Sequence, residues 1–199
     1  MIRNVQLYSG LSDGLVQLPV PDSIKIGSKR FTIPLTMEVF ASSICYGQRL
    51  FIARKEENDF GSILRVMDGY FYPLVTKKNW DEDKALLFGK KILPLFVKDL
   101  YPVAMHLITL VSEMTQREQA LLYKEPTKLE KAAGIDKLNV FSELSSLYFL
   151  RDILKVTIPE VLLTPYNECL VLFMKAKTEA DFQENYNKEL QSINKSKTK

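Results

Sequence analysis

The sequence predicts a mainly α-helical protein, in which a small N-terminal β-hairpin is followed by a bundle of about six short amphipathic helices. Two observations lead to this fold class. Strict alternation of apolar and polar residues, typical of strands, occurs once, between Ile24 and Ile33. From Thr36 onward, apolar residues recur at three- and four-residue spacing, which is typical of amphipathic helices, and prolines keep the helices short.

Length and composition exclude several classes of protein. The chain has 199 residues, of which 46% are hydrophobic and 26% charged, so it can bury one sizeable core. The formal net charge is only +3 and basic residues alternate with acidic ones, so nucleic-acid binding is not expected. The most apolar stretch, residues 92–111, contains Lys98, Asp99 and two prolines, so no membrane-spanning helix is expected.

The location expected from the sequence is a reducing, cytosolic one. The N-terminus lacks the continuous apolar segment of a signal peptide. The two cysteines, Cys45 and Cys169, lie far apart in sequence within apolar helical patterns, so neither a disulfide framework nor a metal-binding pair is predicted.

Residues 1–23 are predicted to form an extended arm. Two glycines and two prolines interrupt a polar stretch that has one short apolar cluster near its end. Such an arm needs a surface on which to lie. It packs either on its own domain or on a neighbouring subunit, and the sequence leaves both arrangements open.

The stretch Ile24–Phe51 is predicted to be a hairpin followed by a single helix. Gly27–Ser28 is the expected turn between two short alternating strands, and Pro34 ends the second strand. Thr36 is a favourable N-cap for the helix, with Leu35 before it and Phe40 after it in the spacing of a hydrophobic staple.

Three further helices are predicted before residue 124. The first begins near Gly61, and Pro73 is expected to kink or end it. The second follows Asn79, which is placed as an N-cap with Glu82 three residues later. The third starts near Pro102 and has a wide apolar face, as expected of a central, mostly covered helix.

The C-terminal part is predicted to be helical with one bend. Between residues 141 and 154 two sets of apolar residues alternate, which predicts a strongly apolar helix; they are Phe141, Leu144 and Tyr148, and Leu147, Leu150 and Leu154. A second helix is expected to start at Thr164–Pro165. Thr178 and Asp181 predict a second cap within it, and therefore a bend.

These elements divide the chain into five predicted segments. They are an extended arm (1–23), a hairpin plus helical core module (24–124), a charged linker (125–137), a C-terminal helical pair (138–190) and a basic tail (191–199).

No residue pattern predicts catalysis, a cofactor or a metal ion, so the chain is not expected to be an enzyme. His106 is the only histidine and has no second ligand nearby in sequence, which favours a hydrogen-bonded helix residue. The acidic cluster Asp81–Asp83 is explained by its place in a first helical turn. Gly27 is not part of a glycine-rich phosphate-binding loop.

Several pieces of the chain resemble the small helical tail assembly chaperones of tailed bacteriophages. The matching pieces are IGSKRFTIPLTMEVF (Ile26–Phe40), ILRVMDGYFYPLV (Ile63–Val75), Pro159-Glu160 and Pro165-Tyr166. The order of these pieces extends the resemblance over about three quarters of the chain. The long N-terminal arm and the basic tail depart from that family and suit a subunit of a larger assembly.

The resemblance implies a non-enzymatic protein that binds apolar helical segments of tail proteins, such as the tape measure protein, in the host cytoplasm during assembly. Partner-binding residues are expected among four aromatics, namely Tyr70, Phe71, Tyr72 and Tyr166, since aromatic side chains dominate interface energies. Core packing explains these residues equally well. The alternative is a structural subunit of the virion, in the neck, tail or baseplate, and self-association is left open.

Overall fold

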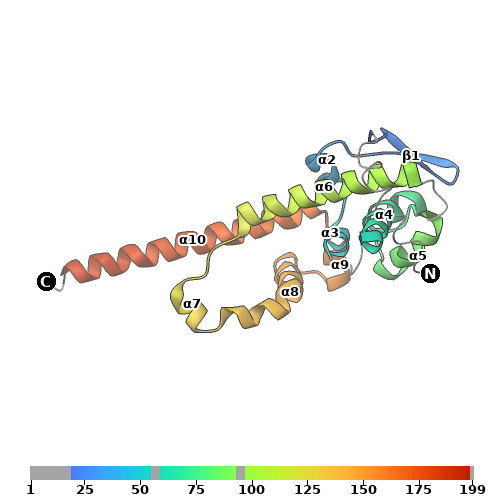
Figure 1. Ribbon diagram of the computed structural model, residues 1–199. Helices are drawn as coiled ribbons and strands as arrows, with labels where there is room; N and C mark the ends of the chain where they lie inside the picture. The colour runs from blue at the N-terminus through green and yellow to red at the C-terminus, as the bar shows by residue number, and fades with distance from the viewer. Residues whose placement is uncertain (1–18, 55–58, 93–96, 198–199) are drawn as a thin grey trace.

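The computed structural model describes residues 19–54, 59–92 and 97–197. It confirms a mainly α-helical chain that starts with a two-stranded hairpin. Most of the predicted N-terminal arm lies outside the described residues. In Figure 1 the hairpin and the first helices form a body at one end, and two long helices lead away from it.

The elements of the described residues follow one another with short connections. The strands are β1 (Ser23–Ile26) and β2 (Lys29–Thr32). The helices are α2 (Met37–Ser42), α3 (Tyr46–Ala53), α4 (Asp59–Thr76), α5 (Glu82–Ile92), α6 (Val97–Leu122), α7 (Lys128–Ala132), the 3-10 helix η1 (Ile135–Phe141), α8 (Ser142–Leu154), α9 (Ile158–Leu163) and α10 (Tyr166–Lys197).

The predicted hairpin is confirmed, and its two strands pair across the predicted turn at Gly27–Ser28. β1 and β2 are antiparallel, with Ile26 paired to Lys29 across a two-residue turn. Gly27 opens this turn at a φ of 64°, a left-handed conformation that favours glycine. Ile24 and Ile26 are both buried, so one face of the hairpin packs on the helices.

The single helix predicted over residues 36–51 is wrong: the structure has α2 and α3 with a break between them. The hydroxyls of Ser42 and Ser43 donate hydrogen bonds to the backbone carbonyls of Val39 and Phe40, one turn earlier, at the end of α2. Such local bonds compete with helix propagation. The chain at Cys45 then pairs with distant backbone, as described below, and α3 begins afresh.

The predicted start of α2 is confirmed only in part. The Thr36 hydroxyl accepts a hydrogen bond from the Val39 backbone N–H at 3.4 Å, as expected of an N-cap. The predicted staple is wrong, because Leu35 keeps 68% of its surface exposed while Phe40 is fully buried. The N-terminus of α5 also differs from the prediction, since Asp81 rather than Asn79 accepts the capping hydrogen bond, from the backbone of Lys84.

The core lies where α4 packs against α3, α5 and α6. Pro73, predicted to kink or end its helix, lies inside the continuous α4. Pro102, near which the next helix is predicted to start, lies inside α6, which begins earlier, at Val97.

The apolar face predicted for α6 is buried, and Val103, Leu107 and Met114 are fully covered. The helix as a whole is less covered than predicted, because most of its residues after Val111 are exposed or half-buried. The largest fully buried side chains of these elements include Phe40, Phe51, Met67, Phe71, Leu107 and Met114.

A partly buried ion pair joins α3 to α6. Arg49 is 6% exposed, and its Nε and Nη2 contact the two carboxylate oxygens of Glu118 at 3.0 and 2.6 Å. Nη2 also donates to the Thr115 hydroxyl at 2.9 Å. This two-pronged contact orients α3 on α6 because the planar guanidinium matches the carboxylate.

The C-terminal helices return to the body rather than forming a separate core. Backbone hydrogen bonds run from Tyr46 to the Thr164 carbonyl and from Tyr166 to the Ile44 carbonyl, at 2.9 and 3.1 Å. They flank a β-bridge between Cys45 and Pro165. This bridge places the start of α10 beside the start of α3. Both cysteines are free thiols.

α10 is one continuous helix, so the second cap and bend predicted at Thr178 and Asp181 are wrong. The Thr178 hydroxyl bonds back to the Met174 carbonyl at 2.9 Å, which leaves the helix unbroken. Asp181 instead pairs with Lys177 and with Lys124, which follows α6. With 32 residues, α10 is about 48 Å long, and Figure 1 shows it continuing beyond the end of α6.

Candidate protein-binding surface

The four aromatics predicted to bind a partner lie in the core of the described structure. Tyr70, Phe71, Tyr72 and Tyr166 are each at most 5% exposed. Tyr70 and Phe71 contact each other edge to face, with ring centroids 5.0 Å apart. A partner would reach these residues only if the core opened, so their role in binding stays a prediction and a candidate surface must be sought elsewhere.

The exposed face of α8 is the first candidate surface. Phe141, at the end of η1, and Leu144 and Tyr148 on α8 are between 48% and 54% exposed. Their spacing of three and four residues puts them on one side of the helix. We call these three residues the α8 stripe.

The opposite face of α8 is held against the body and α10. Leu150 is fully buried there, and the Phe149 ring stacks on Phe173 of α10 with centroids 5.4 Å apart. Glu143 pairs with Arg54, which follows α3, at 3.2 Å. These contacts fix the rotation of α8, and the α8 stripe therefore faces away from the chain's own core.

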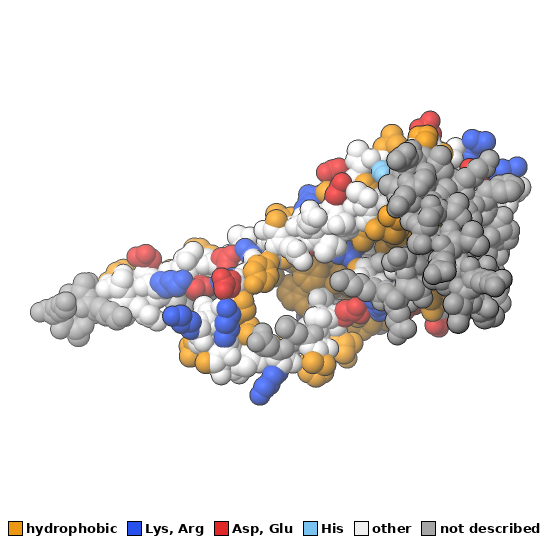
Figure 2. Space-filling view, in the orientation of Figure 1, with side chains coloured by type: hydrophobic (Ala, Val, Ile, Leu, Met, Phe, Trp, Pro, Cys, Tyr) orange, Lys and Arg blue, Asp and Glu red, His pale blue; other side chains and the backbone are white. Residues whose placement is uncertain are grey.

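Apolar exposure continues from α8 into η1 and α7. The segment Lys124–Lys137, predicted as a charged connection, contains α7, whose N-cap Thr127 and Glu130 bond reciprocally. Leu129, Leu138 and Val140 are largely exposed. Together, α7, η1 and α8 form a second arm, which we call the α7–α8 arm. It leaves the end of α6 and returns, through α9, to the start of α10 (Figure 1). Figure 2 shows hydrophobic side chains around a hollow between this arm and the two long helices.

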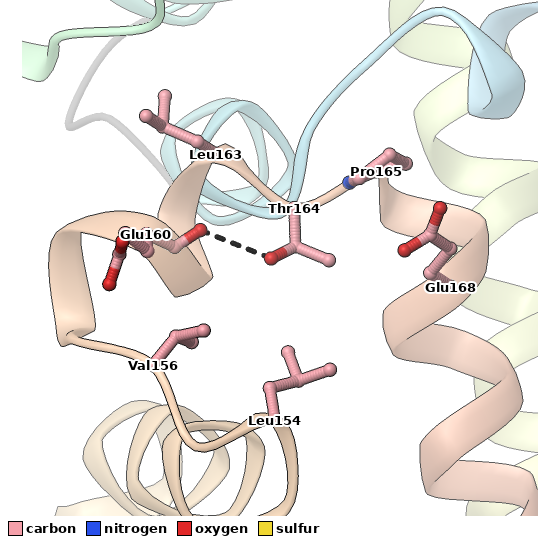
Figure 3. Close-up of a pocket in the computed structure, with 7 residues that line it drawn as sticks. All are labelled: Leu154, Val156, Glu160, Leu163, Thr164, Pro165 and Glu168. Carbon is pink, nitrogen blue, oxygen red and sulfur yellow. Dashed lines mark hydrogen bonds between the residues drawn. The ribbon is translucent and has the colours of Figure 1, made fainter.

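A shallow pocket lies where the end of α8, α9 and the start of α10 meet (Figure 3). Its volume is about 360 Å³. The lining is mostly apolar, with two carboxylates, and comprises Leu154, Val156, Glu160, Leu163, Thr164, Pro165 and Glu168. The Thr164 hydroxyl donates to the Glu160 backbone carbonyl at 3.1 Å, which closes the turn between α9 and α10 (Figure 3).

The pocket has structural rather than acid–base chemistry. The Glu160 carboxylate accepts hydrogen bonds from the Thr157 backbone and hydroxyl at 2.8 and 2.7 Å, and these bonds lower its pKa. Glu160 therefore stays ionised as the cap of α9.

His106 and the acidic cluster Asp81–Asp83 each have a local structural contact. The His106 ring contacts the Pro34 carbonyl at 2.8 Å; because a carbonyl only accepts, Nε2 carries the proton, and the predicted hydrogen-bonded role is confirmed. Asp81 caps α5, with Glu82 and Asp83 in its first turn, as predicted for this cluster. In residues 19–54, 59–92 and 97–197 no group of His, Cys, Asp or Glu side chains could hold a metal ion.

Sequence reasoning missed the α8 stripe, although the signal was present. A helix that is apolar on two faces has more apolar surface than one core contact covers. The alternating sets Phe141–Leu144–Tyr148 and Leu147–Leu150–Leu154 carry that signal. Which set faces inward depends on contacts with α3 and α10, which are distant in sequence.

Comparison of the chain with models of known protein families, with curated proteins and with solved structures gave no match. Among the described helices, none has the length and apolar character needed to cross a membrane.

Proposed function

We propose that this chain is a non-enzymatic assembly protein of the phage tail assembly chaperone type, which binds apolar helical segments of tail proteins such as the tape measure protein. The observation that carries the proposal is the α8 stripe, an apolar row on a helix whose other face is already packed. The sequence resemblance supplies the class of partner. Its expected place of action is the host cytoplasm during assembly.

The α8 stripe has the spacing that helix-in-groove recognition uses. Anchors at intervals of three and four residues lie along one line and match the apolar face of a second helix. The Arg151 guanidinium lies 4.6 Å from the Tyr148 ring centroid. This cation–π contact holds the ring in place before a partner arrives and so lowers the entropic cost of binding.

A structural subunit of the virion is the alternative, because the long α10 suits a contact between subunits. The two functions differ in their assembly state. A chaperone is expected to be a monomer or small oligomer that binds a tape measure fragment, whereas a virion subunit is expected to form a defined ring or lattice. Light scattering with and without the fragment separates the two.

Replacing both Leu144 and Tyr148 with serine is expected to weaken binding of a labelled peptide from an apolar helical stretch of a tape measure protein by at least about tenfold. Two truncated anchors remove more than about 1.4 kcal/mol of binding free energy, which corresponds to that factor. Fluorescence anisotropy measures the change. The fold should persist, since both side chains are about half exposed.

The matched control is Leu86→Ser on α5, which removes a leucine of similar exposure, 53% against 51% for Leu144, far along the chain from the α7–α8 arm. Its affinity for the peptide should equal that of the unaltered chain. If the Leu144→Ser, Tyr148→Ser double variant bound the peptide as tightly as the unaltered chain, binding at the α8 stripe would be contradicted. No binding by the unaltered chain, together with a high-order ring, would favour the virion subunit.

A further inference from the structure

The two cysteines of the chain lie far apart in sequence but at one junction of the fold. Cys45 immediately precedes α3, and Cys169 lies in the first turn of α10. Cys45 pairs with Pro165 in the β-bridge described above, with one backbone hydrogen bond on each side of the pair. Figure 3 shows the pale blue ribbon that leads into α3 beside Thr164 and Pro165.

The bridge puts both cysteines on the same side of this junction. Residues that face each other between flanking hydrogen bonds have Cα atoms about 4.5 Å apart and side chains on one face. The Cys169 N–H donates to the Pro165 carbonyl at 3.3 Å, so Cys169 lies one helical turn, about 6 Å, beyond Pro165 on the same side of α10. The Cα atoms of Cys45 and Cys169 are therefore on the order of 5 to 8 Å apart, which overlaps the range of about 4.4 to 6.8 Å that a disulfide spans.

The ionisation of neighbouring groups also indicates that the two thiols are close. Burial, a charge on Glu168 and a charge on Cys45, in that order of effect, raise the pKa of the Cys169 thiol to about 12. Such an effect of Cys45 requires the two sulfur atoms to be near each other. Burial is also the main cause of the raised pKa of Tyr46, the residue after Cys45, and a charge on Cys169 raises it further. Cys169 therefore faces the start of α3.

We propose that Cys45 and Cys169 form a reversible disulfide when the chain encounters a small disulfide oxidant such as oxidised glutathione. Cys45 is half-buried and Cys169 is fully buried, so the oxidant reaches Cys45 first. The Cys45 thiolate attacks one sulfur of the oxidant, which leaves a mixed disulfide and releases one glutathione thiolate. The Cys169 thiolate then attacks the Cys45 sulfur and releases the second glutathione. The two cysteines thus lose two electrons and two protons, and the oxidant becomes two glutathione thiols.

The disulfide ties the start of α10 to the start of α3 and so holds the C-terminal helices on the body. It closes a loop of roughly 120 residues, and closing a long loop removes much conformational entropy from the unfolded chain. Tyr166, which is 2% exposed, lies between the bridge and Cys169 and stays in the core. The pair therefore acts as a redox switch: the reduced chain can open at this junction, and the oxidised chain cannot.

Oxidation of the folded full chain in buffers of reduced and oxidised glutathione tests this pairing. After the remaining free thiols are alkylated, mass spectrometry should show a single chain that is about 2 Da lighter than the reduced one and carries neither an alkyl group nor glutathione. The midpoint of thermal unfolding should rise by about 5 to 15 °C. A chain that keeps both thiols, a chain that retains glutathione on Cys45, or two chains linked to each other would overturn the proposal.

Two controls test whether the fold brings the thiols together and which one reacts first. In about 6 M urea the same chain should need a glutathione buffer at least about tenfold more oxidising to become half oxidised, because unfolding separates the cysteines. Equal requirements in both conditions would overturn the proposal. Cys45→Ser keeps a favourable N-cap for α3 and should leave the buried Cys169 unmodified. Glutathione on Cys169 in this variant would overturn the order of the two steps.

The disulfide does not depend on the proposed function, and the experiments separate them. The Leu144→Ser, Tyr148→Ser double variant lacks the α8 stripe but keeps both cysteines, so it should form the disulfide like the unaltered chain. Cys45→Ser should bind the tape measure peptide like the unaltered chain, because the α8 stripe is exposed on the α7–α8 arm. Failure of peptide binding therefore leaves the disulfide in place, and failure of the disulfide leaves peptide binding in place.

Discussion

Replacing Glu118 with alanine is expected to lower the free energy of unfolding by about 2 to 4 kcal/mol. The change leaves the Arg49 guanidinium buried without the carboxylate that neutralises it. The expected loss of unfolding free energy is smaller than for a fully buried ion pair, because the Glu118 side chain is partly exposed and water can enter. Urea denaturation measures the change.

The matched control is Glu179→Ala, which removes a carboxylate from an exposed ion pair with Lys175 on α10. This change should cost less than about 0.5 kcal/mol. Arg49→Met should cost less than Glu118→Ala, because Glu118 can be hydrated and methionine fills the space of the arginine stem. Equal effects of Glu118→Ala and Glu179→Ala would show that the α3–α6 ion pair does not stabilise the fold.

Asp68→Asn is expected to raise the free energy of unfolding by about 1 to 3 kcal/mol at pH 8. Asp68 is 5% exposed on α4, and its Oδ1 has no hydrogen-bond partner among the described residues. Gly89 of α5 lies so close that an added Cβ would be 2.9 Å from Oδ2. Burial raises the pKa of Asp68 to about 7, and Arg65 only partly offsets this effect.

The contribution of Asp68 to the free energy of unfolding should depend on pH in one direction. Because the pKa of Asp68 is raised in the folded chain, the folded state keeps a proton that the unfolded state loses above about pH 4. The Asp68 contribution to the free energy of unfolding should therefore fall as pH rises from about 4 to about 7 and then level off. Asp68→Asn should remove this fall and leave stability near pH 4 almost unchanged.

Urea denaturation at several pH values between 4 and 8 checks this prediction. Asp152→Asn is the control, because Asp152 is exposed on α8, where its carboxylate pairs with the neighbouring Arg151. Its pH profile should match that of the unaltered chain. An Asp68→Asn profile that also matches would show that Asp68 is not a buried carboxylate in solution.

Local sequence determined much of the fold. The hairpin follows from alternation around Gly27, which takes the left-handed conformation that its turn needs. Two helix starts depend on contacts between residues only three apart. The Thr36 hydroxyl accepts from the Val39 backbone at the start of α2, and the Glu160 carboxylate accepts from the Thr157 backbone at the start of α9. The buried face of α6 follows from its apolar spacing. Each of these features depends on residues close together in the chain.

Only the tertiary structure decided the remaining features. After the break at Ser42 and Ser43, the place where α3 begins depends on the pairing of Cys45 with Pro165, which no local pattern reports. Tyr70 and Tyr166 are in the core, and the α8 stripe is outside, because distant helices cover one apolar face and leave another exposed. Apolar spacing determines that a face will be buried by something; whether the chain or a partner buries it depends on how the whole chain packs.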